Sequence, residues 1–146
     1  MSHVRTQLRD AVIAAIAADV PGFGGRVDKV RGFSRNRPLM PSCEVSTPGE
    51  ATVGISMDRL LSREIDLEVS VSVIGNDGIE DSADDLAVGI ETAIYASATV
   101  MGLVKEITPS GMQFEMQADG ESRAGRMTLT WACVIVTREG DPKTAL

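Results

Sequence analysis

The fold is decided by residues 63–74, which read REIDLEVSVSVI. Apolar and polar side chains alternate over the whole stretch, which predicts a β-strand with one face packed on a core and the other exposed. The core-facing positions are Ile65, Leu67, Val69, Val71 and Val73. The outward positions include Glu64, Asp66 and Glu68. The strand therefore predicts a sheet whose second face meets water or a polar partner.

An amphipathic helix is predicted ahead of this strand, over residues 1–19. Its apolar side chains recur with the helical period of about 3.6 residues and so form one stripe. The stripe consists of Val4, Leu8, Ala11, Val12, Ala15 and Ile16. Ser2 is a possible N-cap, and Pro21 with Gly22 ends the helix.

A second helix is predicted after the turn at residues 76–78. It is expected to begin near Asp81 or Ser82, with Ser82 and Asp85 as a variant of the capping box. Its end is expected at Met101 and Gly102. The apolar stripe consists of Leu86, Ile90, Ala93, Ile94 and Ser97.

The remaining segments show β patterns. Residues 26–31 predict a short or edge strand, and residues 43–47 a second one that 51–57 extend as the arm of a hairpin. Residues 103–108 and 112–118 predict two strands or one interrupted strand. The last strand, 126–138, has Trp131 and Cys133 on its inward face. Its other face becomes apolar toward the end, which indicates an interior position in the sheet or burial against a partner.

The resulting element order is α-β-β-β-α-β-β. We predict an α+β two-layer sandwich, in which two helices cover one face of a mostly antiparallel sheet of about four to six strands. The 146 residues are expected to form a single domain, 1–146, with a flexible C-terminal tail over 139–146.

Composition excludes several classes of function. Lys and Arg number 14 against 21 Asp and Glu, and a net charge of −7 argues against tight binding of nucleic acid. The sequence offers no membrane-spanning run and no signal peptide, so we expect neither. Two cysteines fit free thiols in a reducing compartment.

The sequence lacks a convincing catalytic or metal-binding motif. The single histidine, His3, lies at the chain end, and neither Cys43 nor Cys133 has a credible base beside it. The glycines at 22, 24 and 25 follow a helix, so they do not form a phosphate loop. The acidic cluster between Asp77 and Asp85 matches no calcium loop, although a bound cation there stays open. We therefore expect no enzyme and no cofactor.

Two charged loops are candidate interaction elements. Arg31, Arg35 and Arg37 form the only basic concentration, which suits either a solvated loop or a contact with an acidic neighbour. The region 119–126 contains mixed charges and is either a mobile hairpin tip or a docking element. We take as interface candidates Arg31, Arg35, Arg37, Asp58, Arg59, Arg63, Asp119, Glu121 and Arg123.

The segments together resemble the tail terminator (minor tail protein U-like) family of long-tailed bacteriophages and related prophage or gene-transfer particles. The resemblance runs from about Val4 to Thr137. The segments that carry it in the first half of the chain are the helix 8–16 with its stop at 20–22, the short segments 26–27, 39–41 and 43–45, and the strand from Arg63. In the second half they are the helix with acidic residues at its start and the segment 129–131 of the last strand.

This resemblance implies a structural virion protein. Members of the family form a hexameric ring on the head-proximal end of the tail tube, where the ring ends tube polymerisation and offers a surface for head–tail joining. It implies three partners: a second copy of the chain, the tail tube protein and the head–tail connector. DNA would pass through without specific binding, and the implied location is the virion, with assembly in the cytoplasm of a host bacterium.

Glu64, Asp66 and Glu68 are then expected to face either the lumen or another tail protein. The alternatives are a neighbouring head–tail completion or tail-tube protein, and an oligomeric cytoplasmic α+β module that binds a ligand or regulates.

Overall fold

A computed structural model describes residues 1–29, 40–75, 77–119 and 122–146. The helices are α1 (Val4–Asp19), α2 (Ile79–Ala96) and α3 (Ala98–Leu103), with a short 3-10 turn, η1 (Pro21–Phe23). The strands are β1 (Val27–Lys29), β2 (Ser42–Gly54), β3 (Leu60–Gly75), β4 (Glu106–Asp119) and β5 (Ser122–Arg138).

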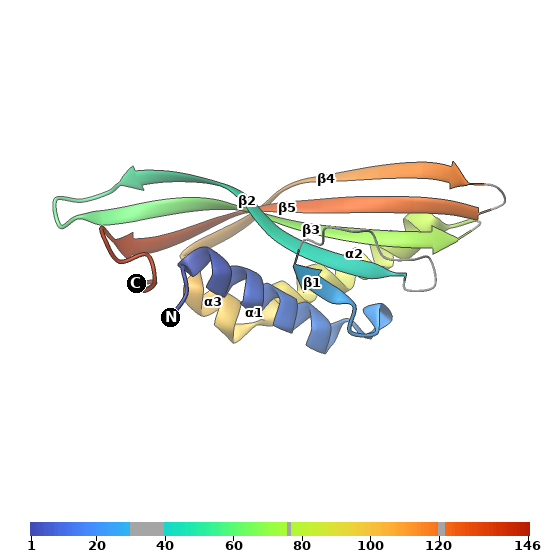
Figure 1. The fold of residues 1–146 in the computed structure, drawn as a ribbon, viewed down its shortest axis with the longest axis horizontal. Helices are drawn as coiled ribbons and strands as arrows, with labels where there is room; N and C mark the ends of the chain where they lie inside the picture. The colour runs from blue at the N-terminus through green and yellow to red at the C-terminus, as the bar shows by residue number, and fades with distance from the viewer. Residues whose placement is uncertain (30–39, 76, 120–121) are drawn as a thin grey trace.

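The strands form one sheet in the order β1-β2-β3-β5-β4. The short β1 runs parallel to β2, and every other pairing is antiparallel. The three helices gather on one side of the sheet, while the β2–β3 and β4–β5 hairpins extend toward opposite ends of an elongated molecule (Figure 1). The predicted α+β sandwich with a mostly antiparallel sheet is confirmed.

The alternation in residues 63–74 produces the expected division between core and surface. All five predicted core positions of β3 are buried, from Ile65 to Val73. On β5, Trp131, Cys133 and Ile135 are buried beside them. The core is mainly aliphatic, and Phe23 and Trp131 are the buried aromatic side chains among the described residues.

Helix α1 buries five of the six residues of the predicted stripe, and Ala15 is half-buried; the buried ones are Val4, Leu8, Ala11, Val12 and Ile16. The predicted N-cap, Ser2, is wrong. His3 caps the helix instead, because its Nδ1 accepts a hydrogen bond from the backbone N–H of Arg5 at 3.1 Å. Imidazole nitrogen can accept that bond as a Ser oxygen would.

The second predicted helix starts earlier and ends earlier than expected. α2 begins at Ile79 behind Gly78, which has φ +71 and offers no side-chain cap, so the expected cap at Ser82 is wrong. At the other end Ser97 interrupts the helix, and its hydroxyl accepts the N–H of Val100 at 3.2 Å to begin α3.

Two strands differ from their predicted bounds because β-bulges carry them through proline. β2 continues through Pro48 with a register shift between Ser46 and Gly49, so the predicted strand and hairpin arm are one strand. β4 begins only at Glu106 and shifts register between Pro109 and Gly111. β5 lies between β3 and β4, so its interior position in the sheet is confirmed, and Val134 and Val136 on its second face are half-buried.

The C-terminal segment, where we expected a flexible tail, is hydrogen-bonded to the rest of the fold. Val4 N donates to Pro142 O at 2.8 Å, and Leu146 N donates to Val136 O at 2.8 Å. Within the described ranges, the structure contains no helix long and apolar enough to cross a membrane.

Candidate interaction surfaces

The open face of the sheet carries most of its charge as carboxylate. Strand register places on this face Glu44, Glu64, Asp66, Glu68, Glu106 and Glu115. In strands β2 to β5, the described basic residues that register puts on the same face are Arg126 and Arg138, near the two ends of β5. The middle of the face is therefore acidic.

The three carboxylates of β3 lie at the centre of this acidic area. Glu64 and Asp66 are exposed, and Glu68 is half-buried. Their cross-strand neighbours on β5 are Val134, Ala132 and Thr130, respectively, none of which is charged. β5 therefore places no compensating charge directly opposite these carboxylates, and their potential extends into the space over the sheet.

On the helix side, a compact ion network joins α1 to the base of the β2–β3 hairpin. Glu50 accepts Arg5 Nη1 on Oε1 at 2.8 Å and Arg63 Nη1 on Oε2 at 2.9 Å. Arg63 also donates through Nε to Thr137 Oγ1 at 3.0 Å. Burial alone would raise the pKa of Glu50, but hydrogen bonds from Thr52, Arg5 and Arg63 lower it below its usual value.

The tip of the β2–β3 hairpin exposes apolar side chains beyond this network. Val53 is 62% exposed, Ile55 50% and Met57 fully exposed. The turn is closed by Ile55 N, which donates to Leu60 O at 3.0 Å. Arg59 takes a left-handed backbone conformation with φ +60, which is uncommon for a residue with a side chain. An ordered turn thus presents these apolar groups to solvent.

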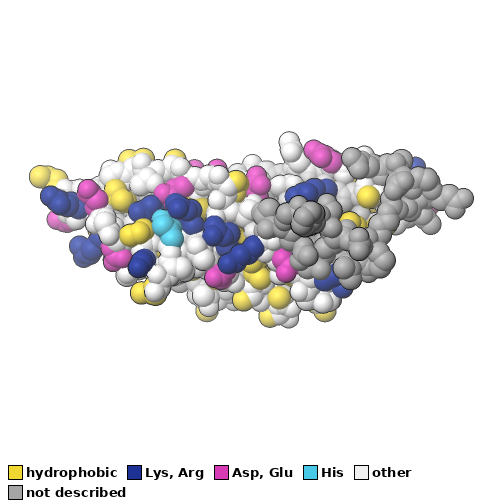
Figure 2. Space-filling view, viewed as in Figure 1, with side chains coloured by type: hydrophobic (Ala, Val, Ile, Leu, Met, Phe, Trp, Pro, Cys, Tyr) yellow, Lys and Arg dark blue, Asp and Glu magenta, His cyan; other side chains and the backbone are white. Residues whose placement is uncertain are grey.

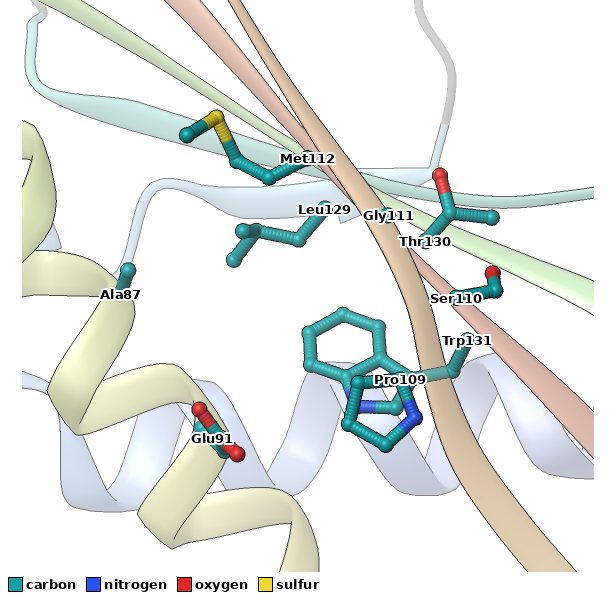
Figure 3. Close-up of a pocket in the computed structure, with 9 residues that line it drawn as sticks. All are labelled: Ala87, Glu91, Pro109, Ser110, Gly111, Met112, Leu129, Thr130 and Trp131. Atoms are coloured by element: carbon teal, nitrogen blue, oxygen red, sulfur yellow. The ribbon is translucent and has the colours of Figure 1, made fainter.

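A cleft of about 380 Å³ separates α2 from strands β4 and β5. Its lining residues are Ala87, Glu91, Pro109, Ser110, Gly111, Met112, Leu129, Thr130 and Trp131 (Figure 3). The indole of Trp131 is drawn between Glu91 on α2 and strand β4. Trp131 is only 3% exposed, yet its Nε1 has no hydrogen-bond partner.

The hydroxyl group of Tyr95 lies near this indole N–H but is bonded elsewhere. Tyr95 donates its own hydroxyl to Ile107 O at 3.3 Å. Burial raises the pKa of Tyr95, Glu91 adds to the increase, and the nearby Trp131 N–H opposes it. That proximity lacks the geometry of a hydrogen bond, so the indole N–H has no partner, and the nitrogen itself is buried away from the surface.

Acidic and basic side chains gather in different parts of the molecule. α2 carries Glu80, Asp81, Asp84, Asp85 and Glu91, all exposed, and no Lys or Arg. Lys and Arg side chains gather instead around the single histidine and toward the β2–β3 end (Figure 2). The described residues contain no group of three or more His, Cys, Asp or Glu that could hold a metal ion, and this includes the cluster on α2.

The two thiols are core groups. Burial raises the pKa of Cys43 to about 12, with Glu44 and Asp28 adding to the increase. Burial raises the pKa of Cys133 to about 12 as well, with a contribution from Asp66. A thiol needs a lowered pKa to act as a nucleophile near neutral pH, and these two have the opposite shift.

The predicted interface residues fall in three places. Asp58 and Arg59 lie at the hairpin tip, and Arg63 takes part in the ion network with a side chain only 11% exposed. Arg123 lies on β5 opposite Ala118 of β4. Asp119 ends β4, while Arg31, Arg35, Arg37 and Glu121 lie outside the described residues.

Sequence reasoning missed the apolar hairpin tip and the cleft. In the sequence, Val53, Ile55 and Met57 continue the alternation of a strand, which gives no sign that their neighbours in space are absent. The cleft depends on the distance between α2 and β4, which no local pattern encodes. The unpaired indole could have been suspected, because Trp131 is the chain's only tryptophan and was placed in the core.

Comparison with known proteins finds no matching family model and no matching curated protein. Among solved structures, a chain from the "Virion of native gene transfer agent (GTA) particle" is similar, with 17% identity and a TM-score of 0.45. The match covers 90% of this chain and 91% of that chain.

Proposed function

We propose that this chain is a structural subunit of a phage-type virion, of the tail terminator kind. Six copies would form a ring on the head-proximal end of the tail tube, end tube growth and offer a surface for head–tail joining. The sequence segments that resemble the tail terminator family suggest this role. The observation that carries it in the structure is the uncovered, acidic face of the sheet.

An acidic sheet face suits the inner wall of a DNA conduit. Phosphates bind where Lys and Arg release their counterions, and a wall of carboxylates instead repels them. Of the central carboxylates of β3, Glu64 and Asp66 are exposed and Glu68 is half-buried, and all three face uncharged residues of β5. They therefore present negative charge to whatever lies over the sheet. DNA would then slide along the wall without being held.

The test of the assembly role is deletion of the chain from the particle that encodes it. The expected result is tails of abnormal length that fail to join heads, seen by electron microscopy. Normal tails joined to heads would refute the proposal. Complementation with the wild-type chain is the control for loss of neighbouring functions.

The conduit is tested separately with a variant in which Glu64, Asp66 and Glu68 are all replaced by Lys. Rings should still assemble, because these side chains lie on the open sheet face, but ejection of DNA should be slowed or blocked. A matched variant replaces three acids of α2, Glu80, Asp81 and Asp84, by Lys and should eject normally. Unchanged ejection in the β3 variant would refute the conduit.

A further inference from the structure

We propose that the tip of the β2–β3 hairpin of one subunit docks into the α2–β4 cleft of a second copy of this chain. The tip is defined by Val53, Ile55, Met57, Asp58 and Arg59, and the cleft by Glu91, Met112, Leu129 and their neighbours. The inference rests on the proposed assembly and names the two surfaces that make its repeating contact.

The hairpin tip exposes apolar side chains that a partner could bury. Met57 is fully exposed, and Val53 and Ile55 are at least half exposed on the same turn. Exposed apolar groups that gather in one place mark an interaction site more often than scattered ones do. The tip is also held in one conformation, since Ile55 N donates to Leu60 O and Glu139 N donates to Arg59 O at 2.7 Å. An ordered tip loses little conformational entropy on docking.

The cleft offers apolar side chains against which the tip can pack. Pro109, Met112 and Leu129 supply an apolar lining, and Met112 is itself 53% exposed. Packing the apolar side chains of the tip against this lining would remove apolar surface from water and so stabilise the contact.

The tip cannot reach the cleft of its own chain. Register pairs Leu60 at the base of the tip with Arg138, and Leu67 with Trp131. Seven strand residues therefore separate tip and cleft, a distance of about 23 Å along the sheet. The two surfaces are different parts of the same chain, so joining them between copies gives a heterologous contact, which repeats around a ring or along a filament.

Charge favours this pairing over contact between two clefts. Every charged residue of α2 is acidic, and Glu91 lies at the cleft. The tip carries both Asp58 and Arg59 and so has no net charge, and the partner of the Arg59 guanidinium across the contact would be Glu91. Two clefts face to face would instead bring the acidic surfaces of two α2 helices together, which like-charge repulsion opposes.

The decisive experiment exchanges the two charges. Arg59→Glu and Glu91→Arg are made as separate chains, and assembly is measured by sedimentation velocity and native mass spectrometry. Each variant alone should lose assembly by about tenfold or more in dissociation constant, since like charges then meet at every contact. Mixed one to one, the two variants should assemble again, because alternating subunits restore an Arg–Glu pair at each contact. Lys143→Glu and Glu80→Arg are controls that should assemble alone as the wild type does.

A second variant tests the apolar contact without altering charge. Met57→Ser replaces the fully exposed apolar side chain of the tip, so it should weaken assembly by about threefold to tenfold while the isolated subunit stays as stable as the wild type. If both charge variants assemble normally, or their mixture does not, the contact is wrong. Wild-type rings in that case would leave the proposed function standing, whereas a wild-type chain that is monomeric at every concentration would refute the contact and the ring together.

Discussion

Glu50 is the residue whose substitution should reveal how the hairpin is held to the helices. Its carboxylate is bound by guanidinium groups from α1 and β3, and its side chain is only 12% exposed. Glu50→Gln keeps the shape of the side chain and removes the charge. A charge-assisted hydrogen bond to the equally buried Arg63 contributes about 1.5–3 kcal/mol, while the more exposed Arg5 adds at most about 1 kcal/mol.

The expected loss of unfolding free energy is therefore about 3 kcal/mol, or about 6–12 °C in melting temperature for a chain of this length. Urea unfolding followed by the fluorescence of Trp131, the chain's only tryptophan, measures it. Glu64→Gln is the matched control, because Glu64 is exposed on the other face of the sheet, and it should change stability by less than about 0.5 kcal/mol. Amide exchange of Ile55 should also quicken in the Glu50 variant if the network holds the base of the hairpin.

The dependence on pH gives a second readout. The pKa of Glu50 lies below its usual value of 4.5 in the folded chain, so its contribution is complete above that value. As pH falls through the lowered pKa, the carboxylate is protonated and the contribution is lost. The difference in free energy of unfolding between the wild type and Glu50→Gln should narrow over that acidic range. A gap below about 0.5 kcal/mol at neutral pH, or one that stays constant into acid, would refute the reasoning.

Three other changes test the local structure. Cys43 and Cys133 should resist a thiol reagent in the native chain and react only at the rate of unfolding, because burial raises the pKa of each to about 12; fast labelling of either would contradict this. His3→Ala should cost about 1 kcal/mol through loss of the N-cap. Burial and neighbouring arginines lower the pKa of His3 from 6.5. In the wild type the contribution of the N-cap to the free energy of unfolding should therefore fade as pH drops below 6.5, and in the variant it should be absent at every pH. Unfolding curves at several pH values measure this. Gly125→Ala would place a Cβ 2.7 Å from Phe114 and should cost about 1–3 kcal/mol, measured by thermal unfolding; an unchanged melting temperature would show that the ring moves aside.

The sequence predicts this fold well where a periodic pattern runs through a long element. The alternation in residues 63–74 places β3 with one face in the core, and the stripe from Val4 to Ile16 places α1. Both follow because burial depends on the side of a strand or helix, which the period fixes. The pairing order and the parallel β1 lie beyond such patterns, because they depend on contacts between distant segments.

The ends of elements were harder to predict, and each error has a local cause. Gly78 starts α2 without a side-chain cap, so the Ser82 signal pointed one turn too far along the chain. Ser97 caps α3 in the middle of what looked like one helix. Pro48 and Pro109 were expected to break strands, yet each lies at a register shift, where a strand tolerates proline. Capping and bulges are decided by single hydrogen bonds, which sequence patterns do not resolve.

The carboxylates on the open face of the sheet connect the stability of the subunit with its proposed function. Glu64, Asp66 and Glu68 lie on one face of β3, with about 6.6 Å along the strand from each to the next, and they face uncharged residues of β5. Their mutual repulsion destabilises the subunit, and β5 places no positive charge directly opposite them. Amide side chains at these positions would therefore favour folding. Asp66→Asn should therefore raise the unfolding free energy by about 0.2–0.5 kcal/mol and, in the assembled particle, slow the passage of DNA. A stabilised subunit with slower DNA passage would mark the face as functional, whereas a stabilised subunit with unchanged passage would mean that the charge serves neither the fold nor the conduit.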